Sequence, residues 1–542
     1  MKKLFCIGAL LLAVAAAFAQ TDRPDDYRTT VIDKDVREFP LKIDLSTPFD
    51  SYLSREYLMW SGKERLWDSI STKAFYGDFG PVPPDRVVPA ERKERVLNGR
   101  IVEMIVYRDS AAAVITHDPS NGYYYMSSSR REGGRWVNAG QNMARSLDAA
   151  RERVRQDLEV FVPRIRRIEQ VMRMPQDKAP FLDYLRRNGQ APKDFILGAL
   201  DTNRIVVYGE YHRRRVSWDL LRSVIADPRF AQTTGIVFME LPSRMQPALD
   251  SFFRKPALDP EILYRIYREE QPHGWWDKGG FEFLKAMWTL NRSLPAAKKI
   301  SVVLADFQIP YSEIANREQF ENCPEEDRNT HMAGVVERTV RASKDKRNNL
   351  FVVGCGHAYK SEVPGGYSTP RGERPVLTAG AQLNARFPGD VFAIFQHVVS
   401  SDNSGGNLRL IRGGMFDRVF EEAGNAPVAF RLKGGPFGAE PFDGGYDEAF
   451  DPRAGRYEDN FDGYLFMQPL ADEMNGDVLY EIFSDSFVDE IKRRAAYMGV
   501  PDDRPHWFGI KTGDLTAERI KEVLRDESEG KKRFPFLSEP GK

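Results

Sequence analysis

The sequence predicts an α/β protein whose larger part is a mainly parallel sheet with helices on both faces, preceded by a smaller α+β domain. Between about residues 204 and 400, short and continuously apolar runs alternate with amphipathic helical segments. Continuously apolar runs are typical of strands buried on both faces, as in a parallel sheet. The length of 542 residues also exceeds what one hydrophobic core usually supports, so we expect at least two domains.

The beginning of the chain predicts export. Two lysines, a short apolar run and the triplet Ala17-Phe18-Ala19 are typical of a secretory signal peptide, which we place at residues 1–19. We therefore expect cleavage after Ala19 and a periplasmic or extracellular protein. No later apolar run is long enough to span a membrane.

The composition narrows the classes of partner. A formal net charge of −1 argues against a role in binding nucleic acid or a polyanionic membrane surface. We expect a small-molecule substrate or a planar ligand instead, and the sequence does not predict the oligomeric state. After the leader the sequence contains two cysteines, Cys323 and Cys355, so a single disulfide bridge between them is possible.

Residues 20–140 predict the smaller α+β domain. Strand-like runs at 101–107, 111–117 and 122–129 indicate an antiparallel sheet, and the proline-rich stretch at 81–93 indicates an extended connector. The strands after helical material are loosely similar to a cone-shaped NTF2-like module.

Residues 141–180 predict a helical connector between the two domains. Apolar positions recur at helical spacing from 146 to 172, and Pro163 predicts a kink or break, which together indicate a helical hairpin.

Residues 181–475 predict the main α/β domain. We expect strands at 204–209, 235–240, 300–305, 350–354 and 391–398, with helical segments between them at 217–226, 245–270, 281–292 and 325–344. The glycine-rich stretch 400–460 predicts long loops or a flap over a pocket, and 461–470 predicts one more buried strand. Residues 476–542 are expected to form a C-terminal helix and a frayed tail.

Ionisable side chains follow four of the expected strands, in the order Glu210 with His212, Glu240, Asp306 and His357. Because the carboxyl ends of parallel strands meet at one edge of a sheet, we expect these side chains to share a site. Glu210 and His212 lie two residues apart, so in extended chain they share one face. A carboxylate beside an imidazole orients the ring and raises its basicity, which suits a general base that acts on water.

Alternatives to this interpretation stay open. Glu210 could cap the next helix, and His212 could form an ordinary hydrogen bond. Glycines flank Cys355 and would let His357 point inward as a second acid or base. Cys355 could itself be a nucleophile, although a small thiol between glycines is more often structural.

Two further groups predict the walls of a substrate pocket. His273, Trp275 and Trp276 are adjacent and would suit an apolar or ring-shaped ligand, unless the two tryptophans only cover the sheet edge. Arg328 and His331 lie three residues apart on an expected helix and so share a face. Arg328 could hold a carboxylate or an oxyanion, or it could pair with the acidic run 325–327.

A divalent metal ion is a further hypothesis. His212, Glu240 and His357 offer nitrogen and oxygen ligands of the kind that zinc and manganese accept. The sequence contains no tightly spaced ligand motif, so the identity and the presence of a metal are left open.

The order of several short motifs resembles the erythromycin esterase-like and ChaN-like superfamily over about residues 180–470. These motifs are GEYH, MELP, GWWDKGGFEFLKAMWTLN, LADFQIP, RNTHMA and GCGHAYK. The resemblance implies an α/β fold and an active site that contains His212, Glu210, Glu240, His357 and Arg328. The chain has GExH where the esterases have GExxH, and Arg213-Arg214-Arg215 where a second histidine pair often follows in the haem-binding branch.

The sequence thus favours a secreted hydrolase of ester, lactone or amide bonds. His212 would be its base and Glu210 would orient the ring, while Glu240 would position water or a metal and Arg328 would stabilise an oxyanion. One alternative is a protein that binds haem or another planar ligand. The other is a non-catalytic protein of an envelope complex.

Overall fold

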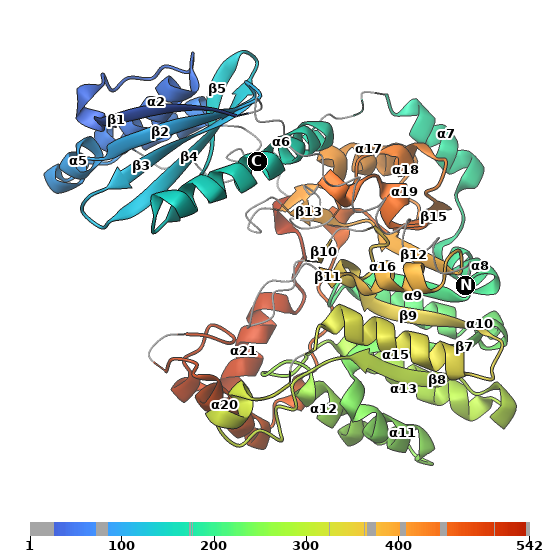
Figure 1. Ribbon diagram of the computed structural model, residues 1–542. Coiled ribbons are helices and arrows are strands. Elements are labelled where there is room, and N and C mark those ends of the chain that lie inside the picture. Colours follow the sequence, from blue (N-terminus) through green and yellow to red (C-terminus); the bar gives the residue numbers. More distant parts are fainter. Residues whose placement is uncertain are drawn as a thin grey trace, which may run out of the picture. The chain divides into compact units, whose positions relative to one another are not determined.

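The computed structural model describes residues 27–71, 85–172, 175, 177–324, 326–361, 364–365, 376–401, 408–444, 452–502 and 505–537. The chain forms two compact units (Figure 1). The first unit ends at Met172, and the second contains Arg173–Ser401 and Leu408–Lys542. The predicted signal peptide, residues 1–19, lies outside the described residues.

An antiparallel sheet forms the centre of the first unit, as predicted. Its strands pair in chain order and are β1 (Tyr27–Asp35), β2 (Arg100–Tyr107), β3 (Ala111–Asp118), β4 (Tyr123–Glu132) and β5 (Arg135–Ala144). Short turns join consecutive strands from β2 through β5, so strands that are neighbours in sequence are also neighbours in the sheet. The likeness to an NTF2-like module stays a prediction.

Helices cover both faces of this sheet. Alternate residues of β3 point to opposite faces, so that Ala113 and Ile115 pack against α6 (Leu147–Met172) while Val114 packs against α2 (Pro48–Ser61). A third helix, α5 (Ala90–Leu97), contacts α2. Each face therefore has its own small apolar core.

Two expectations for the first 180 residues are wrong. α6 is one continuous helix of 26 residues through position 163, not a hairpin, and it belongs to the first compact unit rather than to a separate connector. Contact with the sheet through Ala150, Val154 and Leu158 stabilises its first half. α5 occupies part of the connector predicted at 81–93, of which residues 81–84 lie outside the described part.

The second unit contains the predicted, mainly parallel sheet. Within the described residues its order is β15 (Val428–Arg431), β16 (Gly463–Phe466), β12 (Val391–Gln396), β6 (Ile205–Glu210), β9 (Asn348–Gly354), β7 (Thr234–Pro242) and β8 (Ser301–Asp306). Only the pairing of β15 with β16 is antiparallel among these seven strands. The predicted fold class is confirmed.

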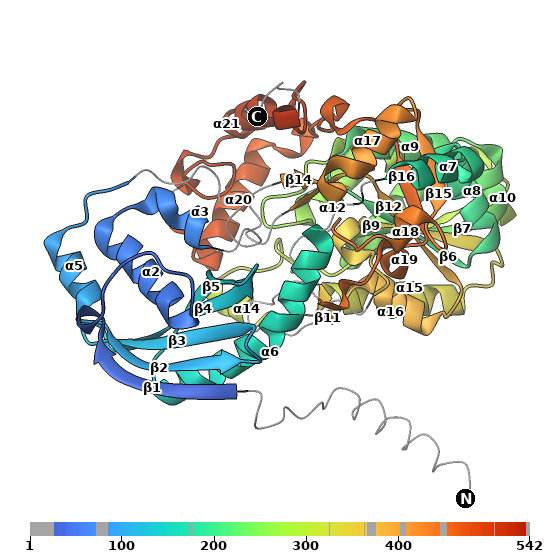
Figure 2. The same cartoon turned by 90° about the horizontal axis from the view of Figure 1, so that it is seen from above.

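Two apolar cores lie on opposite faces of this sheet. Val206 and Tyr208 of β6 belong to one core, and Ile205 and Val207 belong to the other. The first core is covered by α8 (Pro192–Thr202), α9 (Arg215–Ile225), α10 (Pro228–Thr233), α11 (Gln246–Arg254), α12 (Pro260–Glu269) and α13 (Lys278–Ser293). The second is covered by α7 (Ala179–Asn188), α15 (Arg328–Ala342), α16 (Ala379–Arg386) and α17 (Met415–Glu422). Figure 2 shows the strands between α8 and α9 on one side and α15 and α16 on the other.

The glycine-rich stretch 400–460 differs from the predicted loops. Its described residues include α17, β15, α18 (Pro436–Ala439) and α19 (Tyr457–Asn460). Phe416, Phe437 and Tyr457 are buried together in the second core. Their burial packs the described part of this stretch against the sheet, so it does not form the predicted flap. Residues 402–407 and 445–451 lie outside the described part.

The C-terminal region is more ordered than predicted. It contains α20 (Asp485–Met498) and also α21 (Ala517–Ser528), and both helices bury apolar side chains in the first core. No described helix has the length and apolar character that crossing a membrane requires. Cys323 and Cys355 are both buried and are not joined to each other by a disulfide.

The strand order places a crevice at the carboxyl end of β6. From β6 the chain crosses to β7 and β8, returns to β9, and then continues on the other side of β6 with β12. Open α/β sheets bind ligands where the order reverses in this way, because the connections leave in opposite directions and open a space between them.

A buried ion pair stabilises this edge of the sheet. Arg214, which follows β6, donates from Nε to Oε2 of Glu473 at 3.0 Å and from Nη1 to Oε1 of Gln396 at 3.3 Å, and both ionic side chains are fully buried. Gln396 in turn donates to the carbonyl of Gly209 at 2.9 Å. The pair therefore connects the ends of β6 and β12.

We expect Glu473→Gln to lower the free energy of unfolding of the second unit by roughly 3–5 kcal/mol, because Arg214 would stay buried without a counter-charge. The double variant Arg214→Met/Glu473→Leu should recover most of this loss. Asp477→Asn is the control, since the Arg215–Asp477 pair is exposed and should contribute less than about 1 kcal/mol. Calorimetry of all three variants measures the difference, and equal effects of Glu473→Gln and Asp477→Asn would contradict it.

Candidate functional site

A cavity of about 220 Å³ lies at the carboxyl edge of the second sheet. It begins where β6, β7 and β9 end, and α12, α13 and the segment between them close its other side. The ionisable side chains that line it are Glu210, His212, Glu240, Glu270, Asp277 and Arg328, with Trp218, Tyr267 and Trp275 among the aromatic residues. The cavity thus contains most of the predicted catalytic residues.

Glu210 and His212 form a contact of the predicted kind. Glu210 is the last residue of β6 and is 5% exposed, and its Oε1 lies 2.5 Å from Nδ1 of His212. The ring of His212 also meets Trp275 edge to face, with the ring centres 5.0 Å apart. Contact at Nδ1 fixes the tautomer and leaves Nε2 for a substrate or a water molecule. Glu210 does not cap α9, whose N-cap residue is Arg214.

The carboxylates around His212 keep its ring charged at neutral pH. Burial lowers the pKa of His212, but the negative charges of Glu210, Glu240 and Asp277 outweigh that effect and raise the pKa to about 9. In the unliganded protein the ring is therefore mostly an imidazolium below about pH 9.

Gly354, at the end of β9, brings the two halves of the site together. Its backbone N–H donates to Oε2 of Glu240 at 2.6 Å. A β-carbon at position 354 would lie 2.9 Å from Cε1 of His212 and 3.1 Å from Oε2 of Glu240, so any larger residue would require the His212 ring to shift. Glycine lets the backbone approach both groups without this displacement.

Glu240 is held as a carboxylate by Arg328 and His357, which contact it from two sides. Nη2 of Arg328 donates to its Oε1 at 2.7 Å, and Nε2 of His357 lies 3.3 Å from the same atom. Burial raises the pKa of Glu240, but His357 and Arg328 together hold that pKa well below its usual range.

Arg328 joins Glu240 to Asp306. Besides its bond to Glu240, the guanidinium donates from Nε to Oδ1 of Asp306 at 3.0 Å and from Nη2 to Oδ2 at 2.6 Å. Asp327, in the acidic run considered as an alternative partner, caps α15 by accepting from the N–H of Thr330. The guanidinium therefore links the ends of β7 and β8.

The sequence did not reveal Glu270. Its side chain is 4% exposed and lines the cavity; Oε1 accepts from Nε2 of Gln308 at 2.9 Å, and Oε2 has no hydrogen-bond partner among the described residues. Burial, followed by the charge of Asp306, raises the pKa of Glu270 well above its ordinary value. No sequence pattern indicates Glu270, because it follows the end of a helix, α12, and not the end of a strand.

Asp277 is a second carboxyl group that the sequence analysis missed. It is the N-cap residue of α13 and accepts from the N–H of Gly279 at 2.8 Å. Burial and the neighbouring Glu210 raise its pKa to about 6. An aspartate directly before a helix is a recognisable N-cap signal, and this pattern would have placed it correctly.

Five predicted residues do not line the cavity. His357 is buried between Glu240 and Oδ1 of Asn329, and Asp306 is buried against Arg328. His331 contacts Ser243 and Glu326. His273 and Trp276 pack with Phe508 in a separate aromatic cluster, and only Trp275 of the predicted wall faces the cavity. The predictions of His273, Trp276, Asp306 and His331 as pocket residues, and of His357 as a direct acid or base, are therefore corrected.

The residues here do not fit a metal ion. Within the described part of the chain, no three or more His, Cys, Asp or Glu side chains are grouped so that they could hold one. Of the predicted ligands, Glu240 already binds Arg328 and the N–H of Gly354, and a guanidinium at this position repels a cation. We derive no step through a metal.

No protein-family model matches the chain, and no curated protein does. Among solved structures, an erythromycin esterase mutant in its open conformation is similar over 53% of this chain and 95% of its own, with 13% identity and a TM-score of 0.34. A succinoglycan biosynthesis protein covers 54% of this chain and 97% of its own at 9% identity and a TM-score of 0.38. ChaN of Campylobacter jejuni, in a structure with cofacial haem, covers 39% and 87% at 14% identity and a TM-score of 0.26.

The identities are low and the TM-scores lie below 0.5. They therefore carry no argument about activity, which has to come from the site itself.

The charge of His212 can be measured by NMR titration of its ring. We expect a midpoint at about pH 9, and we expect Glu210→Gln to move it down toward the ordinary value of 6.5, because this variant removes the nearest negative charge. Glu326→Gln is the matched control, since it changes a carboxylate that contacts a different histidine, His331. A midpoint near 6.5 in the unaltered protein would contradict the site geometry.

Proposed function

We propose that this protein is an exported hydrolase of ester, lactone or amide bonds, with His212 as the base that activates water. The contact that supports the proposal is the one between Nδ1 of His212 and the buried Glu210, at a cavity that also contains Glu270, a carboxyl group with a raised pKa. An imidazole oriented by a carboxylate is a recurring arrangement in water activation. Export rests on the leader in residues 1–19, outside the described residues.

In the proposed reaction His212 takes a proton from water, and the resulting hydroxide attacks the carbonyl carbon of the substrate. The bond to the leaving group then breaks as that group receives a proton. Glu270 is suited to supply it, because its raised pKa favours the protonated form, it lines the same cavity, and it has an oxygen without a partner among the described residues. The positive charge of Arg328 at the cavity wall favours the negative charge that develops on the carbonyl oxygen.

His357 and Asn329 support the site without facing it. Oδ1 of Asn329 lies 2.7 Å from Nδ1 of His357 and orients this ring toward Glu240. This makes His357 a positioning residue for Glu240.

The size of the cavity limits the substrate. At about 220 Å³ it is smaller than the roughly 300–1,000 Å³ of sites that enclose drug-sized ligands. We therefore expect the cavity to hold the reacting carbonyl and one small flanking group, with the remainder of the substrate outside it.

The alternative of a haem or planar-ligand protein is less well supported by this site. The cavity is small for a porphyrin, and Trp276, the second expected wall, packs elsewhere. Addition of haemin separates the two functions: a stoichiometric Soret band that is lost in His212→Ala, with no hydrolysis of any ester or amide, would replace the hydrolase proposal.

The first test of the proposal is loss of turnover. Against a panel of p-nitrophenyl esters, small lactones and p-nitroanilides, His212→Ala should lower kcat by roughly 10²–10⁴-fold with an unchanged circular dichroism spectrum. His331→Ala is the control, because His331 contacts a carboxylate but does not line the cavity. Equal rates for the unaltered protein and His212→Ala would remove this mechanism.

The pH dependence gives a second test with a defined sign. A base must be deprotonated to act, and the pKa of His212 in the free protein is about 9. We therefore expect kcat/KM to rise about tenfold per pH unit below pH 9 and to level off above it for as long as Glu270 stays protonated. Glu210→Gln should move this rise to lower pH and reduce the plateau. A rate that does not change between about pH 6 and 8 would exclude His212 as the base.

A further inference from the structure

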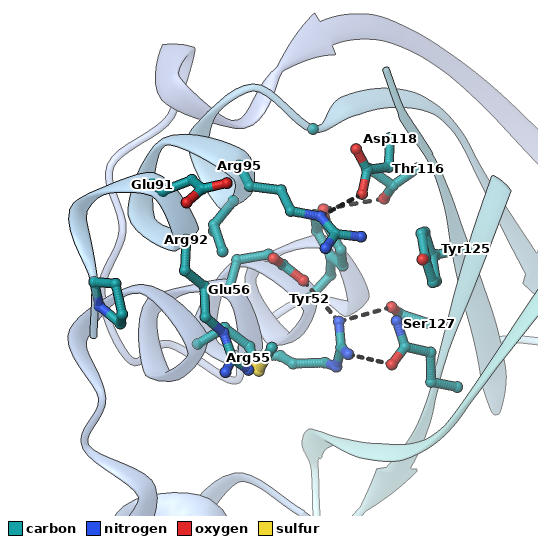
Figure 3. Close-up of a pocket in the computed structure, with 15 residues that line it drawn as sticks. Tyr52, Arg55, Glu56, Glu91, Arg92, Arg95, Thr116, Asp118, Tyr125 and Ser127 are labelled. Atoms are coloured by element: carbon teal, nitrogen blue, oxygen red, sulfur yellow. Dashed lines mark hydrogen bonds and ion pairs between the residues drawn. The ribbon is translucent and has the colours of Figure 1, made fainter. Parts of the chain in front are cut away.

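A second and larger cavity lies in the first unit, remote in sequence from the site described above. It has a volume of about 500 Å³, which falls within the range of sites that enclose small molecules. Figure 3 shows its walls: α2 and α5 on one side and the strands β3, β4 and β5 on the other. All of its lining residues belong to the first unit.

The charges that line this cavity are balanced. Three arginines, Arg55, Arg92 and Arg95, face three carboxyl groups, Glu56, Glu91 and Asp118. Nε of Arg95 donates to Asp118 at 2.7 Å, and Nη1 of Arg55 donates to Glu56 at 2.7 Å. A strongly charged ligand would leave one set of these groups without a counter-charge, so the balance favours a neutral one.

The contribution of Arg55 and Glu56 to packing does not by itself explain why this mostly buried ion pair is present, because removing two charges from water costs free energy. Both side chains are 12% exposed, although hydrophobic residues of similar size would stabilise the unit at least as well. Arg55 is oriented by two more acceptors, Ser127 at 3.2 Å and Gln141 at 2.6 Å. Its guanidinium is thus fixed across the cavity by both walls, as Figure 3 shows.

Several groups on this cavity have unused hydrogen-bonding capacity within the described residues, among them Glu56, Glu91 and Arg92. Within the described residues, Oε2 of Glu56 and the guanidinium of Arg92 make no hydrogen bond or ion pair, yet both residues line the cavity. A carboxylate oxygen only accepts and a guanidinium only donates, so one ligand must offer both kinds of partner. A hydroxyl group does so, because it donates and accepts at the same atom.

We propose that the cavity between α2, α5 and the antiparallel sheet binds a neutral, polyhydroxylated small molecule of the size of a mono- or disaccharide. Ligand hydroxyls donate to Glu56 and accept from Arg92. Tyr125 on β4 lines the same cavity and presents an aromatic ring to the apolar side of the ligand. This binding site does not depend on the proposed hydrolase activity.

The test uses the full-length protein and saturation-transfer NMR with glucose, galactose, N-acetylglucosamine, cellobiose and lactose at millimolar concentration. We expect at least one of these neutral sugars to bind. Arg92→Gln should weaken this binding at least about tenfold and leave the melting temperature unchanged, since Arg92 has no partner within the described residues. Glu56→Gln should weaken it as well, and its melting temperature shows whether the fold is retained.

Glu94→Gln is the matched control. Glu94 lies on α5 like Arg92 but does not line the cavity, so the variant should bind as the unaltered protein does. Glucose 6-phosphate and glucuronate distinguish an anion site: if only these bind, the proposal is overturned. It is also overturned if none of the sugars binds, or if Arg92→Gln and Glu94→Gln bind equally well.

Discussion

The burial of several carboxyl groups at one sheet edge, next to the guanidinium of Arg328, is the constraint on which the candidate site depends. An isolated carboxylate is costly to bury, so each must gain a counter-charge or lose its own charge. Glu240 gains Arg328, His357 and the N–H of Gly354. Glu270 and Asp277 have no such cation in contact, and their pKa values rise. The same edge therefore contains one carboxylate whose pKa is lowered and two carboxyl groups whose pKa values are raised.

Features of the backbone bring these carboxyl groups together at one edge of the sheet. Reversal of the strand order at β6 opens the crevice, and glycine at position 354 lets the main chain approach both His212 and Glu240. Two apolar cores on opposite faces hold the strands that position the polar edge. The buried pair of Arg214 and Glu473 then ties this edge to the C-terminal segment.

The first unit is built on a different principle. Its sheet is antiparallel and its strands pair in chain order. Successive side chains along each strand point to opposite faces of the sheet. One face packs on α6 through apolar side chains, and the other carries both apolar residues and the charged lining of the larger cavity. Balanced charge in that cavity contrasts with the acidic site of the second unit. The two units thus offer recognition sites of different chemistry within one chain.

Local patterns in the sequence determined all strands of the second sheet except β15, several of the helices that cover it, and the strand ends at which Glu210, His212 and Glu240 lie. They could do so because burial on two faces and a position at a strand end both leave a local signature. The tertiary structure alone decided which residues meet. Arg328 reaches Glu240 and Asp306 across the sheet, and Glu270 enters the cavity from beyond α12. The glycine-rich stretch packs as core through its aromatic residues. These outcomes depend on contacts between distant segments, which no local spacing encodes.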